Sequence, residues 1–145
     1  MRNALALIAA LALPGAAQAW EEPARGTPLR ADLMDALRPV AEWSLGAPVE
    51  FVVSDLRVEG DVAFASVTAQ RPGGAAIRIE NTPGYRRGEI DPTTMDGTTM
   101  QALLQRSGRA WVPVHSAIGA TDVWYAAQEF CPVWGPVLPE ICDNK

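Results

Sequence analysis

The sequence predicts an α+β fold: an N-terminal helix packed on a curved four-stranded antiparallel meander, with a short C-terminal helix and a disulfide-stapled tail. Three observations lead to this prediction. Residues 28–43 carry apolar side chains at helical spacing. Residues 48–70 and 98–118 each read as two strands joined by a short turn. Two cysteines lie close together near the end of the chain.

The first nineteen residues are typical of a secretory signal peptide. The start MRN is followed by an uncharged apolar run at 4–13 and by the small-residue pattern AQA at 17–19. The run is shorter than the roughly 20 residues that span a bilayer. We therefore expect residues 1–19 to be removed and residues 20–145 to form a single domain without a membrane span, located in the periplasm or secreted.

The charge balance is acidic. The chain has 12 basic and 17 acidic residues and a net charge of −5, which becomes −6 when Arg2 leaves with the leader. A nucleic-acid binder needs a basic face, so no nucleic-acid partner is predicted; an acidic chain is suited to a cationic partner or to solubility. We predict no cofactor and no metal, because Asp55, Glu59 and Asp61 lie near a turn without the alternating ligands of a calcium loop.

The clearest helix begins after Thr27, a suitable N-cap that is followed by proline at the first helical position. Pro39 lies inside the segment and removes a backbone hydrogen bond, so we expect a kink facing solvent or a helix that restarts after Arg38. The apolar residues recur at helical spacing up to about Trp43: Leu29, Leu33, Leu37, Val40 and Ala41.

Residues 48–70 predict a hairpin that turns at residues 59–61. In its first strand the apolar positions are odd up to Val53 and even from Leu56 onward, which favours a β-bulge at Ser54-Asp55. In the second strand small residues alternate from Ala63 to Ala69, and such a face lets a helix approach closely. The alternative is a strand buried on both sides within a sandwich.

The 71–97 segment has little periodicity, and a loop of this length is either functional or a tolerated insertion. It contains the densest basic and aromatic group of the sequence, Tyr85-Arg86-Arg87, with Arg71 nearby in the chain. Arginine suits carboxylate or phosphate groups and tyrosine can stack on a ring, so these four are predicted binding residues. The alternative is that the acidic residues at 80, 89 and 91 neutralise the arginines in a solvated loop.

Residues 98–118 predict a second hairpin that turns at Ser107-Gly108. Its first half also fits a helix, but the short turn favours strands. Pro113 cannot donate to a sheet ladder, so the second strand should be an edge strand or contain a bulge.

A short helix is expected to begin at Thr121, to bury Val123 and to end at Cys131-Pro132. Cys131 and Cys142 are the only cysteines of the sequence, with ten residues between them. In an exported protein they predict a disulfide that holds the proline-rich tail. A redox or metal pair is the alternative, but the sequence has no Cys-x-x-Cys motif.

His115 is the single histidine of the sequence. General-base catalysis would need a nucleophile and an orienting acid beside it, and no G-x-S-x-G or similar motif occurs. We therefore predict no catalytic residue and keep His115 as a candidate binding residue on a strand. The tryptophans are expected to fill the core and the space beneath the tail, with an aromatic cleft as the alternative.

Three short motifs carry a resemblance: LRP at 37–39, GDVAF at 60–64 with QRPGG at 70–74, and GATDV at 119–123. Together they resemble a family of small exported proteobacterial proteins with no assigned activity. The resemblance covers most of the mature chain and implies an exported single domain without catalytic residues. The element order alone is similar to cystatin-like and nuclear-transport-factor-2-like folds.

Three functional hypotheses are compatible with these patterns. The first is a periplasmic or secreted non-catalytic module that binds a small ligand or an envelope protein through the 71–97 loop and the concave sheet face. The second is an acidic inhibitor of a cationic, lysozyme-like envelope enzyme. The third is a small hydrolase that uses His115.

Overall fold

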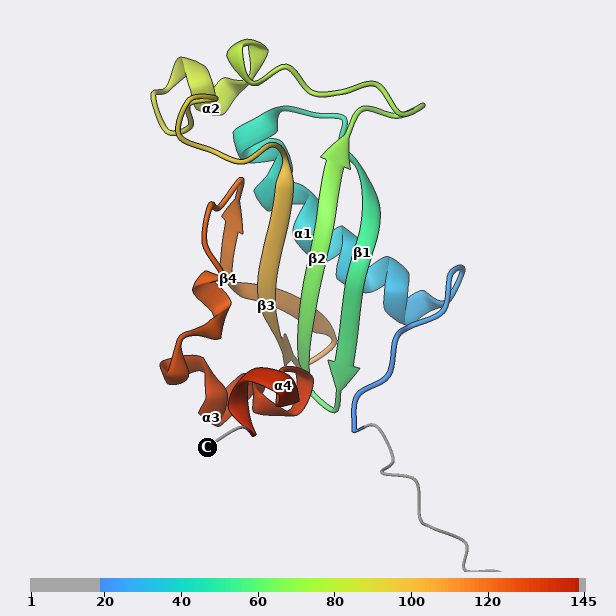
Figure 1. Ribbon diagram of the computed structural model, residues 1–145. Coiled ribbons are helices and arrows are strands. Elements are labelled where there is room, and N and C mark those ends of the chain that lie inside the picture. The colour runs from blue at the N-terminus through green and yellow to red at the C-terminus, as the bar shows by residue number, and fades with distance from the viewer. Residues whose placement is uncertain (1–18, 144–145) are drawn as a thin grey trace, which may run out of the picture.

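The computed structural model describes residues 19–143, so the predicted signal peptide lies outside the described residues except for Ala19. Within this range the fold is α+β, as predicted: a long helix crosses one face of a four-stranded antiparallel sheet, and the short helices of the C-terminal tail lie at one end of the molecule, opposite to the short helix α2 (Pro83–Arg86) (Figure 1). None of the helices in this range is long and apolar enough to span a membrane. The main elements, in sheet order after the helix, are α1 (Pro28–Leu45), β1 (Glu50–Glu59), β2 (Val62–Gln70), β3 (Thr99–Ser107) and β4 (Ala110–Ile118).

Helix α1 begins as predicted, because the Thr27 hydroxyl oxygen accepts a hydrogen bond from the backbone N–H of Arg30 at 3.4 Å. The helix does not restart after Arg38 but continues past Pro39 to Leu45. Pro39 is on the exposed side of the helix, where water can replace the backbone donor that a proline lacks. The side chains that face the sheet recur every four residues and are fully buried: Leu33, Leu37, Ala41 and Leu45.

Strands β1 and β2 form the predicted hairpin. Their register shifts between Val53 and Asp55, which confirms the predicted bulge. Alternate residues of β2 from Ala63 to Ala69 are buried in the cluster that α1 closes, because small side chains leave room for the helix. This face of the sheet is therefore filled by α1 and is closed to a ligand.

Strands β3 and β4 form the second hairpin, but the turn is Gly108-Arg109, one residue later than predicted. Gly108 has a φ of 60°, a left-handed conformation that favours glycine. Strand β4 is at the edge of the sheet and its register shifts next to Pro113, which confirms the prediction for this proline.

The opposite face of the sheet is covered at one end by the C-terminal tail. Phe64 and Leu103 pack there against a second apolar cluster, and the indole N–H of Trp134 donates to the Leu104 carbonyl oxygen at 2.8 Å. The Cys131–Cys142 disulfide closes the tail, as predicted. The tail residues buried in this cluster are Trp134, Val137 and Leu138.

The short C-terminal helix lies later in the chain than expected. Two 3-10 turns, η2 (Trp124–Ala126) and η3 (Gln128–Phe130), follow Thr121, and Val123 is 57% exposed instead of buried. Prolines are tolerated in the first turn of a helix and not in its interior, and each proline of the tail is the first or second residue of a new short turn. These turns are α3 (Cys131–Trp134), η4 (Gly135–Val137) and α4 (Pro139–Cys142).

Candidate functional site

The 71–97 segment closes the C-terminal end of α1, at the opposite end of the sheet from the tail (Figure 1). Arg71 donates to the carbonyl oxygens of Leu45 at 2.8 Å and Pro48 at 3.0 Å, and also to that of Gly46. The last carbonyls of a helix have no partner within it, and a cation is favourable there. Arg71, a predicted binding residue, is therefore engaged in capping α1.

The segment is more ordered than its sequence suggests, since it contains η1 (Ile79–Asn81) and α2 (Pro83–Arg86). Thr82 is fully buried, donates to the Ile79 carbonyl at 2.6 Å and accepts from the Tyr85 backbone N–H at 3.2 Å. Gly84 packs so closely that a Cβ would lie 2.7 Å from the Ser44 carbonyl oxygen. Together these contacts fix α2 against the end of α1.

This packing places Arg87 and Glu89 beside Trp43, and we call these three residues the Trp43 cluster. The Arg87 guanidinium lies over the indole, 4.4 Å from the ring centroid, and donates to the Trp43 carbonyl oxygen at 2.8 Å. Its other hydrogen bonds go to both carboxylate oxygens of Glu89, at 2.7 and 2.6 Å. Trp43 is nonetheless 66% exposed, contrary to the expectation that the tryptophans fill the core.

The electrostatics of the Trp43 cluster follow from this geometry. The hydrogen bond with Glu89 raises the pKa of Arg87. The hydrogen bond from Arg87 lowers the pKa of Glu89, and the charge of Arg87 and a hydrogen bond from the Trp43 side chain lower it further. Both side chains therefore stay charged at neutral pH, which keeps the guanidinium over the ring.

The other predicted binding residues lie in different places. Tyr85 is 41% exposed on α2, next to Arg86, whose guanidinium donates to the Asn81 carbonyl oxygen at 3.0 Å. His115 is on β4 and contacts the C-terminal tail: its ring centroid lies 4.9 Å from that of Phe130 and 5.4 Å from that of Trp134. The structure thus brings Tyr85, Arg86 and Arg87 to one corner and separates His115 from them.

Among residues 19–143 no group of three or more His, Cys, Asp or Glu side chains could hold a metal ion. Within the same residues no hydrogen bond or ion pair joins His115 to a hydroxyl or a carboxylate. The rings of Phe130 and Trp134 contact His115 in a tilted and an edge-to-face arrangement, with interplanar angles of 54° and 79°.

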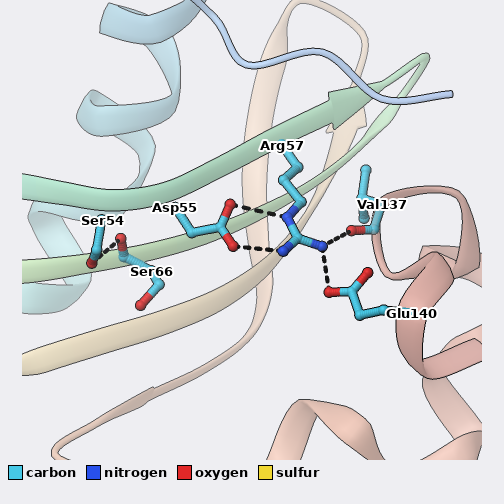
Figure 2. A network of polar contacts seen from close by, with 6 residues as sticks. All are labelled: Ser54, Asp55, Arg57, Ser66, Val137 and Glu140. Atoms are coloured by element: carbon cyan, nitrogen blue, oxygen red, sulfur yellow. Dashed lines mark hydrogen bonds and ion pairs between the residues drawn. The ribbon is translucent and has the colours of Figure 1, made fainter. Parts of the chain in front are cut away.

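Arg57 forms a network that the sequence did not indicate (Figure 2). It donates to both carboxylate oxygens of Asp55, at 2.9 and 2.7 Å, and to the Val137 carbonyl at 3.1 Å, and it also pairs with Glu140. Burial opposes its charge, but these hydrogen bonds and the two carboxylate charges outweigh burial and raise the pKa of Arg57. Because the guanidinium also lies 4.7 Å from the Trp20 ring centroid, Arg57 connects β1 with both ends of the described chain.

Comparison with known proteins identifies no relative: no family model, no curated protein and no solved structure matches this chain. The resemblance to small exported proteobacterial proteins therefore stays a prediction.

Proposed function

We propose that the mature chain is an exported, non-catalytic binding module that recognises a small ligand or an envelope protein through the Trp43 cluster and the neighbouring helix α2. The observation that carries this proposal is a tryptophan that is 66% exposed and yet held by contacts to its ring and its carbonyl group. Exposed Trp, Tyr and Arg side chains are the residue types that dominate binding energy at interfaces. A side chain that is already fixed loses less entropy when a partner binds. The disulfide supports export, because such bonds persist in oxidising compartments.

The test is capture from envelope extract with the mature, oxidised protein and its Trp43→Ala variant. We expect the variant to capture at least tenfold less of the partner than the parent does, since truncating a central anchor typically costs about 2 kcal/mol of binding free energy. Val123→Ala is the matched control, because Val123 is exposed to a similar degree outside the cluster. Equal capture by the Trp43 variant and the parent would remove the proposal.

An acidic inhibitor of a lysozyme-like enzyme is the second candidate. It is favoured by the net charge of −5 and by the exposed turn between β1 and β2, where Glu59 and Asp61 have no ion pair among the described residues. Binding of a cationic enzyme should then weaken steeply as salt rises from 50 to 500 mM, concentrations chosen to shorten the Debye length from about 14 to 4 Å. A flat salt response contradicts this candidate.

The hypothesis of a hydrolase that uses His115 can be tested with a single substitution. Replacement of His115 by Ala should leave any measured binding or activity intact, because the His115 ring makes tilted and edge-to-face contacts with Phe130 and Trp134. Loss of a hydrolytic activity in this variant, with an unchanged circular dichroism spectrum, would restore the hypothesis.

A further inference from the structure

A hollow of about 480 Å³ lies beside the β1–β2 turn, on the face of the sheet that α1 covers. Three parts of the chain that are distant in the sequence meet around it: the segment before α1 with the first turn of α1, the end of the β1–β2 hairpin, and the β3–β4 hairpin. The backbone pairing of Glu21 with Val58, with both hydrogen bonds at 2.9 Å, holds the first part beside the second. A volume of this size is in the range of small-ligand sites.

The apolar part of the lining includes Leu29, Val58 and Trp111, which pack in the cluster between α1 and the sheet. Trp111 is only 7% exposed, and its indole N–H donates to no atom of residues 19–143. The enclosed polar side-chain atoms without a partner in this range are those of Gln101 and Trp124. The Trp111 N–H is not among them, so it reaches solvent. A largely buried tryptophan usually has a partner for its N–H, and Trp111 offers this donor to an occupant of the hollow that it lines.

Charges of both signs surround the hollow. Glu21 and Glu59 line it, and within residues 19–143 neither carboxylate forms an ion pair or a hydrogen bond. Arg106 lines it as well. The Nε of Arg106 donates to the Gly108 carbonyl oxygen at 3.2 Å, and its two terminal nitrogens have no partner in the same range. The acids and the arginine do not pair with each other, so the hollow presents separate negative and positive groups.

We propose that this hollow binds a small zwitterion: a free amino acid or a dipeptide with an apolar side chain. The ammonium group of the ligand pairs with Glu21 and Glu59. Its carboxylate accepts hydrogen bonds from Arg106 and from the indole N–H of Trp111, and its side chain packs on the apolar lining. Arginine and an indole N–H are suitable donors to a carboxylate.

An ion of a single sign fits this lining less well. The net charge of −5 disfavours an anion. A cation leaves Arg106 and the Trp111 N–H without an acceptor. A zwitterion is neutral as a whole, so the net charge of the chain neither attracts nor repels it, whereas the charges at the hollow can still orient it.

The hollow is a different surface from the Trp43 cluster, which lies at the other end of α1, and neither proposal depends on the other. Ala19 and Trp20 also line the hollow. The predicted cleavage after Ala19 changes the backbone there, and the test therefore uses the mature chain that begins at Trp20.

The experiment follows the Trp111 indole signal by NMR during titration with L-leucine and with L-leucyl-L-leucine. N-acetyl-L-leucine and L-leucinamide are matched probes that each lack one charge. In about 0.15 M salt, which screens the long-range effect of the net charge, both zwitterions should shift the indole signal saturably. Each blocked leucine should bind about threefold more weakly or worse, the scale of one exposed ion pair. Tighter binding of leucine or of the dipeptide shows which of the two the hollow accepts.

Three variants assign each end of the ligand. Arg106→Gln should weaken leucine by about threefold or more without weakening leucinamide, which has no carboxylate. Glu21→Gln combined with Glu59→Gln should weaken leucine to a similar extent without weakening N-acetyl-leucine. Trp111→Phe keeps a ring but removes the donor, so it should weaken leucine and spare leucinamide; the amide signal of Gly60, which also lines the hollow, reports binding in this variant.

Arg109→Gln and Glu129→Gln are the matched controls, because both residues are exposed and lie outside the lining. They should leave leucine binding unchanged. If Trp111→Phe does not fold, the variants of the exposed charged residues decide the question. Absence of a saturable shift with both zwitterions overturns the proposal. Binding of either blocked leucine as tightly as leucine itself also overturns it, and so does equal weakening of leucine and leucinamide by Arg106→Gln.

Discussion

The two faces of the sheet are covered in different ways. One face is closed by a single long helix whose buried side chains repeat every four residues from Leu33 to Leu45. The other is closed at one end by a tail of short turns, which a disulfide, Arg57 and the Trp134 hydrogen bond hold in place. The first layer is held by apolar contacts along the whole helix, and the second by an apolar cluster at one end together with these specific contacts. A substitution in the first layer should therefore destabilise the whole protein, whereas a substitution in the second layer should loosen the tail alone.

The largest effect is expected from Leu37→Ala, which removes a fully buried side chain between α1 and the sheet. Truncation of a buried leucine costs about 3 kcal/mol through lost burial and the cavity that remains. Urea unfolding should show this loss with every spectroscopic signal, because the tail needs the sheet beneath it. Val123→Ala, at an exposed position, should change the free energy of unfolding by less than about 0.5 kcal/mol. Separate transitions for sheet and tail would contradict the comparison.

Removing the disulfide should affect the second layer alone. Cys131→Ser combined with Cys142→Ser frees a loop of ten intervening residues, which is worth about 2 to 3 kcal/mol. The Trp134 indole hydrogen, bonded to Leu104 in the parent, should exchange much faster, while the amides of β1 and β2 exchange as before. Equal acceleration at both places would show that the tail is part of the main folding unit.

Arg57→Met tests how much the tail depends on a single cation. The variant keeps much of the side-chain volume but loses the bonds to Asp55, Val137 and Glu140. We expect a loss of about 1 kcal/mol, because both carboxylates can return to water. Thermal unfolding measures this loss, with Arg106→Met as the control; an unchanged melting temperature would mean that the disulfide holds the tail without Arg57.

The smallest effect is expected in the 71–97 segment on acidification. The pKa of Glu89 is lowered by the hydrogen bond from Arg87, and that of Asp91 by hydrogen bonds from Thr93. A lowered carboxylate pKa adds stability above the ordinary value, 4.5 for Glu89, and that stability is lost as pH falls through the folded pKa. Carboxyl carbon shifts should place both folded pKa values below the ordinary ones. Backbone shifts should then change in the 71–97 segment and not in β2.

Most of the fold could be predicted because its patterns are long. The helix has a cap and a repeated apolar position, and the odd-to-even change in β1 located the bulge at Ser54. The disulfide of the tail was predicted, but the turns of the tail could not be predicted, because they are three or four residues long and carry no period. Proline alone indicates where such a turn can start and not which face it covers.

Only one part of the candidate site was singled out from the sequence. The Tyr85-Arg86-Arg87 group indicated the segment that contacts Trp43, but the contact of Arg87 with Trp43 spans 44 positions, and nothing local encodes it. One sequence pattern did indicate that Trp43 is exposed. Trp43 lies two residues from both Ala41 and Leu45, which are buried, and therefore on the opposite side of the helix. Spacing along α1 would have identified Trp43 as exposed.

Arg57 contacts residues near both ends of the described chain, and this has a practical consequence. Residues near Trp20 and Asp143 lie at one end of the molecule, and α2 lies at the other (Figure 1). A protein anchored to a sensor chip by its carboxyl terminus would therefore present Trp43 and Tyr85 to the solution. The same anchoring would suit display on a bead or a phage particle.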